Sequence, residues 1–127
     1  MKTPEELKYA KTHEWIKQVE DGTWLIGITD YAQDQLGSLV YINLPEVDDE
    51  LTIGQAFCDV ESVKADSDIN APLAGTIVEV NEELSDAPEK LNEDPYGAWI
   101  CRVQASQLDE ELMDSAAYIA FCEKEAA

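Results

Sequence analysis

The segment AFCDVESVKADSDINA, residues 56–71, is the part of the sequence on which the interpretation of the fold depends. Residues 56–62 and 66–71 have the composition of two short β-strands, with only VKA between them. Two strands joined by so short a connection form a hairpin, and we predict its tip at residues 62–66. Lys64 would then project into water, where another enzyme can reach its amine.

Short strands are also predicted on both sides of this hairpin. Asp21-Gly22 is a turn signal between two strand-like runs, so residues 14–28 are predicted to form a second hairpin. Segments 46–52 and 81–95 are polar, and we expect at most two helical turns in the second. The remaining predicted strands are residues 39–44, 76–80 and 98–103.

Helical patterns are few and lie mostly near the ends of the chain. A capping threonine followed by proline and two acids predicts that a short N-terminal helix starts at residues 3–6. Thr29 and Gly37 are a cap and a stop for a helix at 31–36, and three- and four-residue apolar spacing predicts a C-terminal helical segment at 106–124. Many short strands with frequent turns favour a small barrel or sandwich over a parallel α/β sheet.

The length of the chain predicts one domain, residues 1–127, because no linker-like composition interrupts it. Apolar residues make up 45% of the chain, which favours a folded core over disorder. The net charge is −20, from 28 acidic and 8 basic residues. Such a surface repels nucleic acid and anionic membranes and favours a monomer. It either steers the protein toward basic patches on protein partners or is simply a solvated surface, and charge alone does not decide between the two.

The first residues of the sequence bear on the compartment of the protein, and its three cysteines bear on the redox state. The first residues lack the apolar core of a signal peptide and are too acidic for a transit peptide. We therefore expect a cytoplasmic protein, or one of the mitochondrial matrix if the chain is a processed form. Cys58, Cys101 and Cys122 are far apart and odd in number, which favours reduced thiols over a disulfide framework.

The acids around Lys64 allow two interpretations of this residue. Two acids precede it within five residues, Asp59 and Glu61, and two follow within four, Asp66 and Asp68. The simpler interpretation is an exposed lysine that pairs with its acidic neighbours, and spacing alone favours it. The other is a carrier lysine, whose amine is acylated to give a long, uncharged arm on a rigid hairpin. The local pattern does not decide between them.

A set of ordered motifs favours the carrier. Glu61-Ser62-Val63-Lys64-Ala65 resembles the lipoylation site of the glycine cleavage system H protein family. The resemblance covers about residues 7–124, and the ordered set is far more specific than any one motif. The other matching segments, in chain order, are YAKTHEW at 9–15, GITDYAQ at 27–33, LPE at 44–46, PLAG at 72–75, VEVN at 78–81, LN at 91–92, PYG at 95–97 and Trp99.

This resemblance implies a fold and a function. The fold would be mainly β, a flattened barrel-sandwich hybrid like a lipoyl domain, with a short N-terminal helix and C-terminal helices. Lipoic acid would be joined to Lys64 by an amide, within a recognition motif of Glu61, Ser62, Val63 and Ala65. The chain would be a carrier rather than an enzyme, because the reactive sulfur belongs to the cofactor.

The resemblance also implies partners. The carrier would take an aminomethyl group from a pyridoxal-phosphate glycine decarboxylase and bring it to a tetrahydrofolate-dependent aminomethyltransferase. Dihydrolipoyl dehydrogenase would reoxidise the arm, and lipoylating enzymes would attach it. The loaded arm would rest near Thr12, Glu14 and Asp68, where carboxylates can bind the cationic cargo amine. For His13, a structural, hydrogen-bonded role is preferred over contact with the arm.

Other functions are less well supported. Biotin carriers usually have methionine on both sides of the lysine, whereas Lys64 lies between Val63 and Ala65. Lipoyl domains of 2-oxoacid dehydrogenases typically have Asp-Lys-Ala, whereas this chain has Val-Lys-Ala. An H-like protein that mainly donates lipoate to other enzymes remains an alternative. An enzyme that uses Cys58 or Glu61 lacks an ordered triad, a metal-ligand set or a phosphate loop, and the single histidine cannot build a usual metal site.

Overall fold

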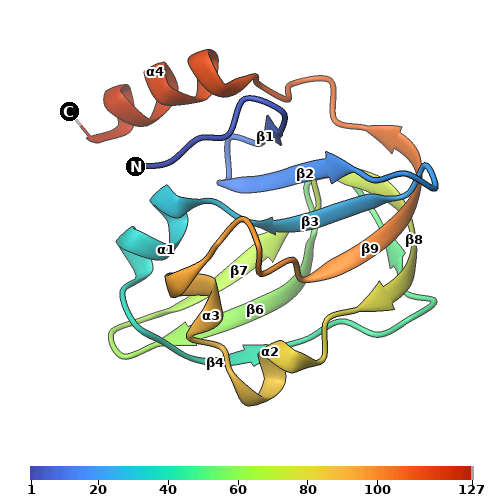
Figure 1. The fold of residues 1–127 in the computed structure, drawn as a ribbon, viewed down its shortest axis with the longest axis horizontal. Coiled ribbons are helices and arrows are strands. Elements are labelled where there is room, and N and C mark those ends of the chain that lie inside the picture. Colours follow the sequence, from blue (N-terminus) through green and yellow to red (C-terminus); the bar gives the residue numbers. More distant parts are fainter. Residues whose placement is uncertain (127) are drawn as a thin grey trace.

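Two antiparallel sheets form the body of the protein in the computed structural model, which describes residues 1–126 (Figure 1). Both sheets contribute to one apolar core. The predicted mainly β sandwich is confirmed, and the sheets stay separate rather than closing into one barrel. The larger sheet has the order β1 (Lys8–Tyr9), β2 (Glu14–Gln18), β3 (Trp24–Ile28), β9 (Cys101–Leu108), β8 (Leu73–Val80) and β5 (Glu50–Leu51); the smaller has the order β4 (Leu39–Asn43), β6 (Ala56–Ser62) and β7 (Asp66–Asn70).

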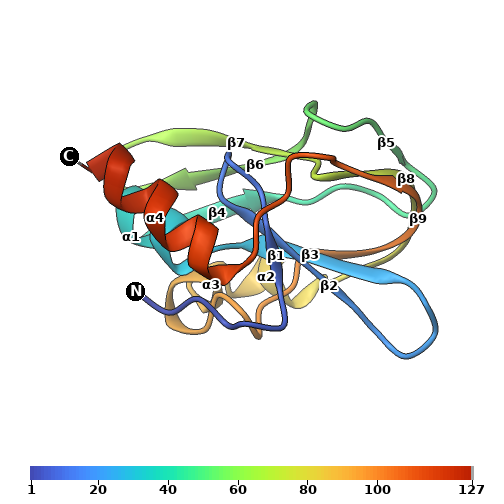
Figure 2. The ribbon, with the colours of Figure 1, turned by 90° about the horizontal axis from the view of Figure 1, so that it is seen from above.

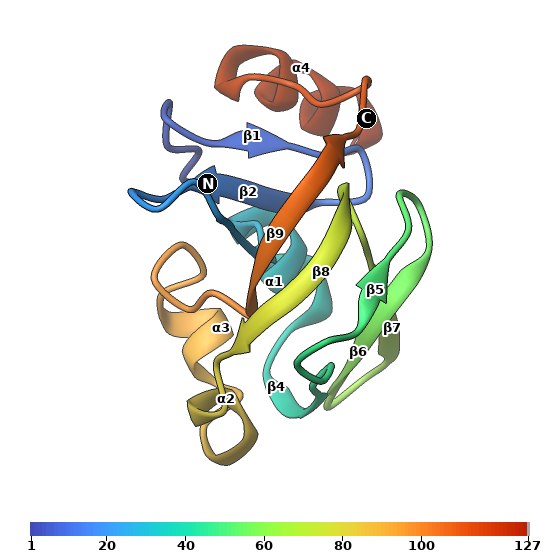
Figure 3. The ribbon, with the colours of Figure 1, turned by 90° about the vertical axis from the view of Figure 1, so that its right-hand side faces the viewer.

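The long strands β8 and β9 run side by side through the middle of the larger sheet (Figure 3). Alternate side chains of β8 point into the sandwich, so that Leu73 and Ile77 are fully buried. Val60 and Ile69 meet this core from the smaller sheet. The hairpin that carries Lys64 is therefore rooted in the core by its own strands.

The β2–β3 hairpin and the helix after it follow the predicted local signals. Gly22 has φ 86°, a left-handed conformation that suits glycine, and the Asp21 carboxylate accepts the Thr23 N–H at 3.0 Å. Helix α1 (Asp30–Leu36) is capped by Thr29, whose hydroxyl accepts the Ala32 N–H at 3.1 Å. It ends at Gly37, with φ 78°, as predicted.

The predicted helix at residues 3–6 is wrong. Residues 3 and 4 have no regular secondary structure, and residues 5 and 6 form a turn that leads toward β1. The backbone carbonyls that a helix would use are bonded elsewhere: Ser115 donates its hydroxyl hydrogen to the Thr3 carbonyl at 2.7 Å, and Tyr9 donates to the Pro4 carbonyl at 2.6 Å. Tertiary hydrogen bonds override the helix-start signal here.

The predicted C-terminal helical segment, 106–124, begins too early. Residues 106–108 continue β9, because β8 starts at Leu73 and pairs with them in the register Leu73↔Leu108. One helix follows, α4 (Ser115–Ala126), and it packs over β1 (Figures 1 and 2). The polar segment 81–95 contains two single-turn helices, α2 (Glu83–Asp86) and α3 (Lys90–Glu93), as expected.

The three cysteines are free and buried, as predicted for reduced thiols. Burial raises the pKa of the Cys101 thiol to about 12. It also raises the pKa of the Cys58 thiol well above its ordinary value, and nearby Cys101, Asp59, Glu14 and Asp68 act in the same direction. A raised pKa keeps these thiols protonated, which further disfavours the alternative of an enzyme that uses Cys58 as a nucleophile.

Candidate functional site

Lys64 lies in the three-residue turn between β6 and β7, at one end of the molecule (Figures 1 and 2). Ser62 organises this turn. Its hydroxyl oxygen accepts the N–H groups of Lys64 at 3.3 Å and Ala65 at 3.0 Å, and its own hydroxyl hydrogen is donated to the Ala65 carbonyl at 3.0 Å. The Ser62 N–H also donates to the Ala65 carbonyl at 2.8 Å, so the root of Lys64 is held in a bonded turn.

The end of helix α1 supports the turn from one side. The Val63 N–H donates to the Ser38 carbonyl at 3.1 Å. A β-carbon built on Gly37 would lie 3.5 Å from Lys64 Cε, so the lysine stem lies along this glycine. Among residues 1–126, Lys64 makes no ion pair, which disfavours the interpretation as a lysine paired with its acidic neighbours.

Glu14, at the start of β2, is a buried carboxylate that is only 2% exposed. Thr12 donates its hydroxyl hydrogen to Oε1 of this group, and the Asn70 N–H donates to Oε2 at 3.2 Å. Burial raises the pKa of Glu14 to about 7, although both hydrogen bonds act in the opposite direction. A carboxylic acid that ionises near neutrality can bind a cation by charge-assisted hydrogen bonds once it loses its proton.

Asp68 is exposed and lies on the outer face of the smaller sheet, because its neighbour Ile69 points into the core. It lines a hollow of about 370 Å³ together with Asn43 and Asp59. No hydrogen bond among the described residues joins Asp68 to Thr12 or Glu14. The structure therefore brings Thr12 and Glu14 together and leaves Asp68 outside this hydrogen-bonded pair.

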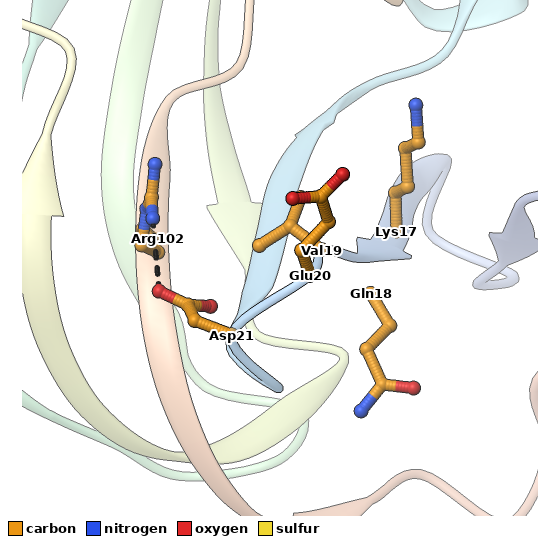
Figure 4. Close-up of a pocket in the computed structure, with 6 residues that line it drawn as sticks. All are labelled: Lys17, Gln18, Val19, Glu20, Asp21 and Arg102. Atoms are coloured by element: carbon orange, nitrogen blue, oxygen red, sulfur yellow. Dashed lines mark hydrogen bonds and ion pairs between the residues drawn. The ribbon is translucent and has the colours of Figure 1, made fainter.

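Another hollow, of about 600 Å³, lies at the β2–β3 turn, at the end of the molecule opposite Lys64 (Figures 1 and 2). Figure 4 shows its lining, which includes Lys17 and Arg102. Arg102 already pairs with Asp21 and Glu79, at 3.2 Å each, so its charge is neutralised within the chain. This hollow has no excess of basic groups for an anionic ligand.

Sequence reasoning missed the support that distant segments give to the site. The Asn70 N–H on Glu14 and the packing of Gly37 against Lys64 both join residues far apart in the chain. No local signal could have indicated them. His13 also has defined partners, Tyr118 and Glu125, which the sequence could not reveal.

Two further properties limit the class of protein. Within residues 1–126, no helix is long and apolar enough to cross a membrane. The same residues contain no group of three or more histidine, cysteine, aspartate or glutamate side chains that could hold a metal ion. A small two-sheet fold with an accessible lysine on a rigid turn is typical of carrier domains that present a covalently attached group to other enzymes.

Comparisons with known proteins identify the kind of carrier. A family profile described as "Glycine cleavage H-protein" matches residues 7–125. A probable glycine cleavage system H protein of Pyrococcus abyssi is 55% identical over 123 residues, which cover 94% of this chain and 92% of that protein. The glycine cleavage system H protein of Lachnoclostridium phytofermentans is 49% identical and covers 98% of both chains.

A solved structure agrees with the sequence relatives. The crystal structure of a glycine cleavage system H protein from Mycobacterium marinum superposes with a TM-score of 0.86 at 36% identity, covering 98% of this chain and 99% of the other. The chain therefore belongs to the glycine cleavage H-protein family, the lipoyl carriers of the glycine cleavage system. It is a carrier component of that multienzyme system.

Proposed function

We propose that Lys64 is the residue to which lipoic acid is attached, through an amide with its side-chain amine. The observation that carries this proposal is the bonded turn, in which Ser62 holds the backbone of Lys64 and Ala65 while the lysine makes no ion pair among residues 1–126. When bound, lipoic acid supplies a disulfide that takes up the aminomethyl group of glycine and later releases it.

The turn also gives lipoylating enzymes a defined target. Glu61, Val63 and Ala65 are exposed around the lysine, and Val63 is 72% exposed. Because the turn is already ordered, an enzyme that modifies Lys64 does not have to order this backbone on binding. We assign the recognition motif to Glu61, Ser62, Val63 and Ala65.

We assign the resting site of the cargo amine to Thr12 and Glu14, with Asp68 as a second acid. Glu14 fits the role because its carboxylate is held from two sides and has a pKa of about 7. A cationic amine beside it would favour the ionised form and lower that pKa. Asp68 lies four residues beyond Lys64 along the chain, on β7, the strand that follows the turn.

The partners follow from the family's place in the glycine cleavage system. They are a pyridoxal-phosphate glycine decarboxylase, a tetrahydrofolate-dependent aminomethyltransferase, dihydrolipoyl dehydrogenase and the lipoylating enzymes. The chain itself would act as a non-catalytic, monomeric, single-domain protein of the cytoplasm. Its residues hold and shield the cargo, and the partner enzymes supply the acids, bases and further cofactors.

The test is a glycine–bicarbonate exchange assay with the lipoylated chain and a glycine decarboxylase of the same system. The proposal expects labelled bicarbonate to enter glycine only when the carrier is lipoylated at Lys64. A chain that accepts lipoate but supports no exchange would instead be a donor in lipoate relay, and this result would overturn the carrier role proposed here.

A further inference from the structure

His13 lies between the two cargo-site residues, Thr12 and Glu14, and has an unusual backbone conformation. Its φ of 74° is in the left-handed region, which residues other than glycine adopt infrequently. Its N–H donates to the Ala10 carbonyl at 3.0 Å, and its carbonyl accepts the Thr29 N–H at 3.1 Å. Such a conformation persists where the surroundings hold it in place.

The side chain of His13 is itself held by a series of hydrogen bonds that reaches two helices. Nδ1 is 2.7 Å from the Tyr118 hydroxyl, and Nε2 is 2.8 Å from the Glu125 carboxylate, both on α4. The Tyr118 hydroxyl is also 2.7 Å from the Thr29 hydroxyl, which caps α1. One buried hydroxyl therefore joins the His13 ring to both helices.

The direction of these bonds can be deduced for the neutral ring. The Glu125 carboxylate only accepts, so the single N–H of a neutral imidazole must be on Nε2. Nδ1 is then an acceptor, and Tyr118 donates its hydroxyl hydrogen to it. The Tyr118 oxygen remains free to accept from Thr29, whose own oxygen accepts the Ala32 N–H. The neutral tautomer with its proton on Nε2 therefore gives every group in this series of hydrogen bonds a partner.

Aromatic contacts fix the same ring in position. His13 stacks on Tyr31 of α1 with ring centroids 4.6 Å apart, and Phe121 of α4 lies at 5.9 Å. Tyr118 in turn stacks on Tyr9 of β1 at 4.6 Å. Figures 1 and 2 show α4 lying over β1 on the side of the molecule where α1 is found. Helix α4 thus contacts the turn at residues 10–14 through the side chain of His13.

We propose that His13 is a positioning residue for the cargo site, anchored by Tyr118 of α4. It sets the turn that places the Thr12 hydroxyl and the Glu14 carboxylate side by side, and it does not itself touch the cargo. This inference rests on the proposed function, because it gives α4 and the single histidine a role in protecting the loaded arm.

The first test uses the chain without lipoate. His13 is the only histidine, so its ring nitrogens can be assigned without ambiguity by ¹⁵N NMR. We expect the neutral ring to carry its proton on Nε2, and Tyr118→Phe to move the Nδ1 resonance toward that of an unbonded ring nitrogen. A neutral ring protonated on Nδ1, or an Nδ1 resonance unchanged in Tyr118→Phe, would overturn the proposal.

The second test measures how long the aminomethyl-loaded carrier survives in water. Tyr118→Phe removes one hydroxyl and keeps the ring that stacks on Tyr9, so we expect a lifetime about fivefold shorter. Tyr31→Phe is the matched control, because it also removes a tyrosine hydroxyl beside His13 but leaves the hydrogen-bond chain intact. We expect that control to match the wild type, and equal losses in the two variants would contradict the proposal.

A double variant separates this inference from the proposed function. If His13 acts through Glu14, Tyr118→Phe has no further effect on the lifetime in a Glu14→Gln background. A Glu14→Gln lifetime equal to the wild type would show that the cargo site itself is wrongly assigned. If Glu14→Gln shortens the lifetime and Tyr118→Phe does not, the positioning role alone is overturned.

Discussion

Glu14 of the larger sheet accepts a hydrogen bond from the Asn70 N–H of the smaller sheet, at 3.2 Å between Asn70 N and Glu14 Oε2. Asn70 ends β7, the strand that begins just after Lys64. The carboxylate at the proposed cargo site is therefore linked directly to the hairpin that presents the proposed arm. One buried group joins the two sheets and both halves of the site.

This burial predicts a specific pH dependence of stability. The folded chain holds the Glu14 proton more tightly than the unfolded chain, because its pKa is raised from 4.5 to about 7. Between those pH values the folded state binds more protons, so this group lowers stability as pH rises. The shift corresponds to about 3 kcal/mol, reached in full above about pH 7.

Glu14→Gln tests this dependence, because the amide has a similar shape and cannot ionise. We expect urea unfolding to show that the variant gains about 3 kcal/mol relative to the wild type between about pH 4.5 and about pH 8. Stability curves that run parallel over this range would contradict the assignment of a buried, titrating Glu14.

Ser62 is predicted to matter for lipoylation through the shape of the turn. Ser62→Ala removes the hydroxyl that bonds Lys64 and Ala65, and we expect about fivefold lower kcat/KM for the lipoylating enzyme. Ser67→Ala is the control, since that hydroxyl makes one weak contact, at 3.4 Å to the Asp68 carbonyl. Equal rates for both variants would show that the bonded turn is unimportant.

Gly27 is predicted to be intolerant of any side chain. A β-carbon there would lie 2.5 Å from ring carbons of Trp15, which is buried with Tyr9 and Tyr118 in an apolar cluster separate from the core between the sheets. We expect Gly27→Ala to lower the free energy of unfolding by about 2 kcal/mol or more. Gly54→Ala is the comparison: its β-carbon meets nothing within 4 Å, and its φ of 84° costs about 1 kcal/mol. A smaller loss at Gly27 than at Gly54 would contradict the steric account.

The acidic surface predicts a salt dependence of partner binding. With a net charge of −20, we expect the complex with the glycine decarboxylase to weaken as ionic strength rises, mainly through slower association. Surface plasmon resonance at several salt concentrations measures this directly. Affinity that does not change with salt would remove the steering role from the surface charge.

The sequence predicted local features well and tertiary features poorly. The cap at Thr29, the stop at Gly37 and the strands around Lys64 depend on neighbouring residues, and all three agree with the structure. The helix at 3–6 and the early start of the C-terminal helix were wrong, because contacts with Ser115 and with β8 override local preference.

The candidate site also has features that the local sequence predicts and features that only tertiary packing creates. The motif around Lys64 was evident in the sequence because it is contiguous. The contact of Asn70 with Glu14 and the anchoring of His13 by Tyr118 join segments 56 and 105 residues apart, and no periodicity encodes them. They depend on how the sheets and α4 pack, which only the folded chain reveals.

The central claim is that Lys64 carries the lipoyl group, and intact mass spectrometry tests it most directly. The chain is expressed in lipoate-fed cells that have working lipoylation enzymes, beside Lys64→Arg and the control Lys17→Arg. We expect one lipoyl adduct on the wild type and on Lys17→Arg, and none on Lys64→Arg. An unmodified wild type, or an adduct that persists in Lys64→Arg, would contradict this account.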